Sequence, residues 1–184
     1  ELYLCSLLML AVFAGMIWYL AEYVSSNQEA LFNNSYNSQQ RVLAQENTRG
    51  TIYAGTGEVL AQTVIAEDGT SVREYPYKNI FAHVVGYTDK GKTGIEELEN
   101  YQLIHSDISD REKLDHELAG EKNPGNDVYT TLDTSLQQAA SDALGLYRGA
   151  IVVTEVKTGR VLAMVSKPDY DPNKIAENWE TLST

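Results

Sequence analysis

The sequence contains very little cysteine and histidine. The only cysteine, Cys5, lies in an apolar run at the start of the chain, which excludes an internal disulfide and a zinc site built on several thiolates. The three histidines, His83, His105 and His116, are far apart and form no HExxH pair. We expect them to be ordinary surface or packed side chains. The sequence therefore predicts neither a metal site nor a cofactor.

Basic residues are also scarce. The chain has 14 lysines and arginines against 26 acidic residues, which gives a net charge of −12. A nucleic-acid-binding protein needs a basic face to neutralise phosphates, so we expect no nucleic-acid partner. The acidic balance is typical of a soluble extracytoplasmic region without defining one.

A serine nucleophile with a neighbouring base is missing as well. None of the serines is followed by a lysine three residues later, the spacing that lets a lysine activate a hydroxyl from the next helical turn. The acidic pairs Glu96-Glu97 and Asp107 with Asp110 are expected on solvated helix faces, without a pocket. The sequence predicts no catalytic residue in this chain.

Charge is absent from the 19-residue segment Leu2–Leu20. At about 1.5 Å per residue, such a helix covers the hydrocarbon thickness of a bilayer. Trp18 and Tyr23 lie at its far end, where amphipathic rings favour the interface. A cleaved signal peptide would have a shorter core and an A-x-A-like exit, and a buried soluble helix is rarely apolar on every face. Residues 21–40 contain no lysine or arginine, so we expect the bulk of the chain outside the cytoplasm.

The rest of the chain alternates short strand and helix patterns. Residues 25–45 are rich in Asn, Gln and Ser, which favours a flexible stalk or a frayed helix. We expect strands at 51–53, 59–61 with an extension over 63–67, 72–75, 81–86 and 128–132, and helices at 95–104 and 107–118. The first two strands should form a hairpin, because the residues between them include a Gly-containing turn.

The last third of the chain predicts a capped helix followed by a β-hairpin. Asp133 is a good N-cap. The apolar face expected on this helix consists of Leu136, Ala139, Ala140, Ala143 and Leu144. Residues 150–156 and 160–165 are β-rich runs that are joined by Lys157-Thr158-Gly159. We expect the hairpin to expose apolar faces and a free edge, with a protease-resistant core that ends near residue 147.

Four motifs occur in an order that is characteristic of one family. In chain order they are Arg49–Tyr53 with Gly57–Ala61; Gly94-Ile95-Glu96; Gly125–Val128 with Thr131-Leu132-Asp133 and Leu136-Gln137; and Gly149–Val153 with Thr158-Gly159, Val161–Ser166 and Pro168–Asn173. The positions singled out as structural are Arg49, Gly50, Gly57, Gly94, Glu96, Asp127, Asp133 and Gly159. Together the motifs resemble the class B penicillin-binding proteins. Ala54-Gly55-Thr56 departs from the Asp-Arg-Asn type run that is common in the family.

Two further stretches, Arg73–Pro76 and Phe81–Tyr87, resemble the penicillin-binding protein A and penicillin-binding protein 2-like subgroup. The resemblance implies an α+β fold. An N-terminal transmembrane helix would precede an elongated pedestal of short strands and helices, followed by a β-hairpin that begins the transpeptidase domain. The implied domains are a transmembrane anchor at 1–23, a pedestal or dimerisation-type module at 24–148, and an incomplete start of the transpeptidase domain at 149–184.

The resemblance also implies a function in cell-wall synthesis. The chain would be the non-catalytic, membrane-anchored portion of a peptidoglycan D,D-transpeptidase, in the bacterial cell membrane with a single span. Its implied partners are the membrane and a SEDS-family glycosyltransferase, and stem peptides and β-lactams would bind only to a catalytic domain that the chain lacks. Since the chain starts at Glu1 and stops at Thr184 without a helix stop, we expect a piece of a longer protein.

Two Lys-Thr-Gly triads resemble the substrate-binding triad of that family. Lys92-Thr93-Gly94 precedes a predicted helix, and Lys157-Thr158-Gly159 lies at a predicted turn. We interpret both as turns, because the family's triad lies far after the nucleophile. Ser25-Ser26-Asn27 spells the family's Ser-x-Asn motif, and we interpret it as chance because it is next to the span.

Arg49 and Glu96 lie in two of the motifs although they are distant in sequence. One hypothesis is that they form a bidentate ion pair, or share one hydrogen-bond network, in the heart of the pedestal. The other is that they are separate surface charges. Two other functions also stay open: a free-standing membrane-anchored interaction or sensor domain without catalysis, and a β-lactam resistance enzyme with an additional front domain.

Overall fold

The computed structural model describes residues 2–27, 31–32, 39–66 and 70–182. The chain forms two compact units, residues 1–40 and residues 41–184. The stalk expected at 25–45 lies partly outside the described residues, at 28–30 and 33–38. Its described ends are helical, because α1 continues to Ser26 and α3 spans Gln39–Glu46.

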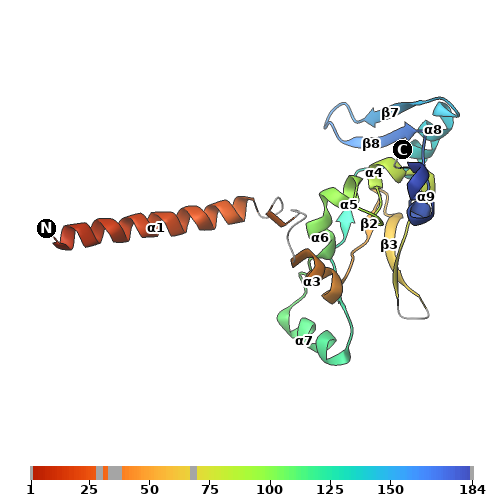
Figure 1. Ribbon diagram of the computed structural model, residues 1–184. Helices are drawn as coiled ribbons and strands as arrows, with labels where there is room; N and C mark the ends of the chain where they lie inside the picture. The colour runs from red at the N-terminus through yellow and green to blue at the C-terminus, as the bar shows by residue number, and fades with distance from the viewer. Residues whose placement is uncertain (1, 28–30, 33–38, 67–69, 183–184) are drawn as a thin grey trace. The chain divides into compact units, whose positions relative to one another are not determined.

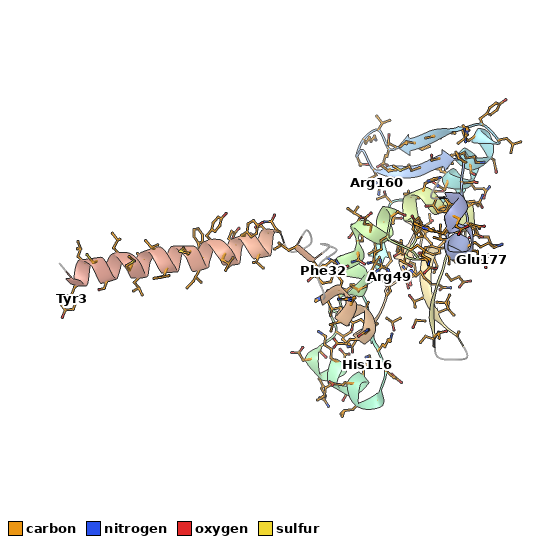
Figure 2. The ribbon with its side chains drawn as sticks, viewed as in Figure 1. Tyr3, Phe32, Arg49, His116, Arg160 and Glu177 are labelled. Atoms are coloured by element: carbon orange, nitrogen blue, oxygen red, sulfur yellow. The ribbon has the colours of Figure 1, made fainter. Side chains whose placement is uncertain are left out.

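The first unit is dominated by one long apolar helix, α1 (Leu2–Ser26) (Figure 1). Its segment Tyr3–Ser26 is long and apolar enough to cross a membrane. The apolar side chains point outward all around the helix, and Tyr3 is labelled at its start in Figure 2. Such a surface is stable where lipid covers it, which agrees with the expected span.

The second unit is built on a four-stranded sheet with the order β4-β3-β2-β6. Its strands are β2 (Ile52–Tyr53), β3 (Val59–Ile65), β4 (Ser71–Glu74) and β6 (Val128–Tyr129). β2 and β3 pair antiparallel, as the predicted hairpin requires, and β6 pairs parallel to β2. The strand expected at 128–132 is shorter than predicted, because β6 ends at Tyr129. A separate parallel pair joins β1 (Asn47–Thr48) to β5 (Asn123–Pro124).

Short helices cover this sheet. They are the 3-10 helix η1 (Lys78–Ile80), α4 (Ala82–Val85), α5 (Gly94–Leu98) and α6 (Asn100–Ile104). The core between sheet and helices consists mainly of Ile52, Leu60, Ala61, Tyr75, Phe81, Val85, Leu103 and Leu132. The helix expected at 95–104 is broken at Glu99, which lies between α5 and α6.

The strand predicted at 81–86 is wrong. Residues Ala82–Val85 form the helical turn α4, which ends at Gly86 with φ of 85°. Phe81, Ala82 and Val85 are buried, whereas His83 is exposed. This spacing is helical. A short apolar run cannot by itself distinguish a buried strand from one turn of a buried helix.

Helix α7 (Asp110–Ala119) begins later than the predicted start at residue 107. The reason is its N-cap, since Ser109 accepts from the backbone N–H of Glu112 and Glu112 accepts in return from Ser109. The helix has no buried residue. Figure 1 shows α7 at the end of this unit opposite to β7 and β8.

Helix α8 (Thr134–Leu144) begins after the predicted N-cap, whose carboxylate accepts from the backbone N–H of Leu136. The apolar face predicted for it is confirmed only at Ala140, because the other buried residues of α8 are Gln137 and Ser141. The Gln137 side chain donates to the carbonyl oxygens of Ile80 and Met164 and accepts from the Met164 N–H. These hydrogen bonds turn a polar side chain inward and leave Leu136 partly exposed.

The predicted C-terminal hairpin is present as β7 (Gly149–Thr154) and β8 (Val161–Lys167), paired antiparallel. The expectation that its apolar faces are exposed is wrong for β8, because Ala163 and Val165 are buried. On β7, Val152 is exposed. The chain then forms the 3-10 helix η2 (Pro172–Lys174) and α9 (Ile175–Leu182).

Candidate functional site

Glu96 is the centre of a buried cluster of charges in the second unit. Its side chain is completely buried on α5, and its Oε2 atom accepts from Nε of Arg49 at 2.6 Å. Its Oε1 atom accepts from Nε of Arg73 at 2.8 Å and from the hydroxyl of Tyr75 at 3.2 Å. The hypothesis that Arg49 and Glu96 pair is confirmed. The expectation that Glu96 lies on a solvated face is wrong.

Arg49 binds more than the carboxylate. Its Nη2 donates to the main-chain oxygen of Glu96 at 2.6 Å, and its Nη1 donates to Oδ1 of Asn100 at 2.8 Å. The guanidinium therefore does not form two parallel bonds with the carboxylate, as the bidentate hypothesis required. It binds the side chain and the backbone of α5 and also reaches α6. Figure 2 labels Arg49 in the crowded interior of the unit.

Arg73 brings β4 into the same cluster. Besides Glu96, Arg73 contacts the chain just before β2 and a residue of β3. Its Nη1 donates to the Gly50 carbonyl oxygen at 2.7 Å and to Oγ1 of Thr63 at 3.1 Å. Its Nη2 is buried without a hydrogen-bond partner among the described residues. In the sequence, Arg73 and Tyr75 stand out only as parts of a subgroup motif, and their contacts with Glu96 were not predicted.

The electrostatics of the cluster follow from burial. Desolvation lowers the pKa of Arg49, and the neighbouring Glu96 carboxylate opposes that shift. Burial, together with the negative charge of Glu96, raises the pKa of Tyr75 above its ordinary value of 10.0. The raised pKa keeps the Tyr75 hydroxyl protonated at neutral pH, so it can donate to Glu96. Two guanidinium groups therefore form ion pairs with one buried carboxylate.

Two glycines let the backbone reach this arrangement. A Cβ on Gly50 would lie 2.0 Å from the Asn126 carbonyl oxygen, so only glycine fits beside that chain. Gly94 begins α5 with φ of 61°, and a Cβ there would lie 2.6 Å from the Val84 carbonyl oxygen. Lys92-Thr93-Gly94 is therefore the entry turn of a helix, as interpreted from the sequence.

The remaining motif residues lie outside the charged cluster. Asp127 accepts from the backbone N–H of Thr51 at 2.8 Å and so holds the start of β2. Asp133 caps α8. Gly57 and Gly159 lie in the β2–β3 and β7–β8 turns, both with positive φ. The second Lys-Thr-Gly triad is thus at a hairpin turn, as interpreted.

No group of three or more His, Cys, Asp or Glu side chains suited to a metal ion is present in the described part of the chain. One open apolar pocket of about 260 Å³ lies between β6, β8 and the helices α4 and α5. Its lining includes Val84, Ile95, Tyr129, Val161 and Met164. Among the described lining residues, Glu99 supplies a carboxylate, and Tyr129, Thr130 and Thr131 supply hydroxyl groups.

Comparison with known proteins agrees with this arrangement. Residues 49–128 match the penicillin binding protein A dimerisation domain, and residues 149–184 match the penicillin binding protein transpeptidase domain. The peptidoglycan D,D-transpeptidase PbpA of Mycolicibacterium smegmatis is 41% identical over 164 residues, which cover 78% of this chain and 33% of that protein. The peptidoglycan D,D-transpeptidase MrdA of Escherichia coli is 34% identical over 138 residues, or 57% of this chain and 22% of that protein.

A solved structure shows the same fold. The crystal structure of PBPA from Mycobacterium tuberculosis matches with a TM-score of 0.65 at 34% identity, over 75% of this chain and 35% of that chain. The chain spans about a third of the length of these PbpA and PBPA relatives. With matches to both the dimerisation and the transpeptidase domain, the chain belongs to the class B penicillin-binding proteins, in the subgroup of penicillin-binding protein A and penicillin-binding protein 2.

Proposed function

We propose that this chain is the non-catalytic, membrane-anchored portion of a peptidoglycan D,D-transpeptidase that acts in cell-wall synthesis. The observation that carries the proposal is the order of the two domain matches, 49–128 and 149–184, behind a helix that is long and apolar enough to cross a membrane. Relatives named as peptidoglycan D,D-transpeptidases match 78% and 57% of this chain. The full protein would thus join stem peptides and react with β-lactams.

The proposed anchor is α1, inserted once in the bacterial cell membrane. Its apolar surface favours lipid on every side, and the following residues up to Gln40 carry no lysine or arginine. That charge pattern supports an extracytoplasmic position for residues 41–184. The anchor would hold the enzyme in the plane where glycan strands are polymerised.

The proposed role of the pedestal is to hold the catalytic domain rigidly. The Arg49–Glu96–Arg73 cluster fastens α5 to the β2–β3 hairpin and to β4, so these elements move together. A glycan polymerase of the SEDS family would contact the membrane helix and the pedestal. The chemistry itself needs a serine with a lysine one helical turn later, and no serine of these 184 residues has that spacing.

Fluorescent penicillin tests this proposal. The 184-residue chain should give no covalent label. The protein expressed from the complete reading frame should be labelled, and pre-incubation with unlabelled penicillin should block that labelling because the serine is already acylated. A matched version of the complete protein without residues 1–27 should leave the membrane fraction and still be labelled. A complete protein that takes no label would contradict the transpeptidase assignment and favour an interaction or sensor domain.

A further inference from the structure

The segment that follows β8 is fixed to the pedestal through one asparagine. Asn173 lies in η2, 98 residues after Tyr75, and its side chain forms two hydrogen bonds with the Tyr75 backbone. Oδ1 accepts from the Tyr75 N–H at 2.9 Å, and Nδ2 donates to the Tyr75 carbonyl oxygen at 3.0 Å. The side-chain amide of Asn173 thus satisfies both backbone groups of Tyr75, as a neighbouring strand would do at the end of β4.

The orientation of this asparagine is itself fixed. Oδ1 of Asp171 accepts from the backbone N–H of Asn173 at 3.0 Å and from its Nδ2 at 2.9 Å. The flanking residues Pro172 and Ile175 are buried. The side chain therefore reaches Tyr75 from a rigid turn, which reduces the conformational entropy lost on binding.

Tyr75 connects this turn to the buried charges. Its ring is buried, and its hydroxyl donates to Oε1 of Glu96, the same oxygen that accepts from Arg73. A continuous chain of contacts therefore runs from the Arg49–Glu96–Arg73 cluster through Tyr75 to Asn173. The side chain of Tyr75 contacts the cluster, while its backbone contacts the segment matched to the transpeptidase domain.

Three neighbouring contacts join the same two segments without passing through Tyr75. Nδ2 of Asn79 donates to Oδ2 of Asp169 at 2.9 Å. The hydroxyl of Tyr170 donates to the Ala82 carbonyl oxygen at 3.0 Å. Nε2 of His83 lies 2.9 Å from the Pro168 carbonyl oxygen. They provide controls, because they hold the segment close to η1 and α4 without touching Glu96.

We propose that Asn173 is a positioning residue, which holds the transpeptidase domain in register with the pedestal, and that Tyr75 relays the state of the Glu96 cluster to it. This inference rests on the proposed function. Loss of the Glu96 contact frees the Tyr75 ring, the end of β4 shifts, and the Asn173 amide loses its two backbone partners. The pedestal thus sets the orientation of a domain whose chemistry lies elsewhere in the protein.

Hydrogen exchange of the complete 184-residue chain in detergent tests the relay. Asn173→Ala should speed exchange in residues 168–180 about tenfold, since each of two lost bonds contributes about 0.5–1.5 kcal/mol. Tyr75→Phe should speed exchange there about threefold, although its hydroxyl does not contact that segment. The double variant should exchange no faster than Asn173→Ala alone. Asn79→Ala is the control, and its effect should add to that of Tyr75→Phe.

Two exchange results would overturn the relay: Tyr75→Phe leaving residues 168–180 unchanged, or Asn173→Ala speeding exchange equally around Leu60 and Leu103. Acylation by fluorescent penicillin, measured on the complete protein, tests positioning. Asn173→Ala should slow acylation about tenfold, because small misplacements of reacting groups are costly, with little change in Tm. An unchanged acylation rate would overturn the positioning role. A wild-type protein that is not acylated would contradict the proposed function alone, and the exchange result would still decide the relay.

Discussion

Thr63 and Arg73 face each other across β3 and β4, and the Thr63 hydroxyl joins both arginines of the buried cluster. It donates to the Arg49 carbonyl oxygen at 2.9 Å and accepts from Nη1 of Arg73 at 3.1 Å. A small β-branched residue at this position keeps its hydroxyl within reach of both. The cluster is therefore assembled by strand register, since a slip of one residue would turn Arg73 to the other face of the sheet.

The first prediction concerns the central carboxylate. Glu96→Gln should destabilise residues 41–184 by about 3–5 kcal/mol, because it leaves two largely buried guanidinium groups without their counter-charge. Urea unfolding followed by circular dichroism measures the change. Glu97→Gln is the matched control, because Glu97 is the exposed neighbour on the same helix, and its effect should stay within about 0.5 kcal/mol. Equal effects of the two variants would contradict a role for the cluster in stability.

The second prediction concerns the close approach of two backbones. Gly50→Ala should cost at least about 2 kcal/mol, because the new methyl group would lie 2.0 Å from the Asn126 carbonyl oxygen and neither chain can move freely. Gly149→Ala is the control, since its nearest neighbour would be Cδ1 of Leu144 at 3.7 Å. Thermal unfolding of both variants under one set of conditions gives the comparison. A wild-type Tm for Gly50→Ala would show that this contact relaxes at little cost.

The sequence predicted the parts of the fold that local chemistry determines. The β2–β3 hairpin, the Asp133 cap and the β7–β8 hairpin each depend on residues close together in the chain, and each was predicted correctly. The pairing of Arg49 with Glu96 was one of two open hypotheses, suggested by their places in the family motifs, because spacing alone cannot bring residues 47 positions apart together.

The failures have a common cause in tertiary context. Residues 82–85 form a helical turn, whose buried side chains pack against residues that are distant in sequence. The Gln137 side chain is buried because it donates to the carbonyl oxygens of Ile80 and Met164. Neither partner is visible from a local pattern. Arg73 was missed for the same reason. The signal available in the sequence was the two-residue spacing of Arg73 and Tyr75, which places both side chains on one face of a strand.

The third prediction concerns pH. The folded-state pKa of Tyr75 lies above the ordinary 10.0 because burial and Glu96 disfavour the phenolate. A raised pKa contributes stability that is fully present below about pH 10 and is lost as the pH rises from there through the folded-state pKa. Wild-type chain should therefore lose stability between pH 9.5 and 11 more steeply than Tyr75→Phe. Parallel urea-unfolding curves across that range measure the difference. Tyr53→Phe, at a half-buried tyrosine, serves as the control. If wild type and Tyr75→Phe lose unfolding free energy with pH at the same rate, the burial argument is contradicted.

The last prediction concerns the attachment of β8. Gln137→Leu keeps a similar volume but leaves the Met164 N–H and the carbonyl oxygens of Ile80 and Met164 without a buried partner. Unpaired buried groups cost about 1–3 kcal/mol each, so β8 should detach from α8 before the pedestal unfolds. Limited proteolysis should give a wild-type resistant core that includes residue 165. The Gln137→Leu chain should be cleaved before β8. Gln138→Leu, at an exposed position whose side chain donates to Oδ1 of Asp142, should behave as wild type. Wild-type cleavage near residue 147 would restore the expectation that the hairpin is an unpacked tail.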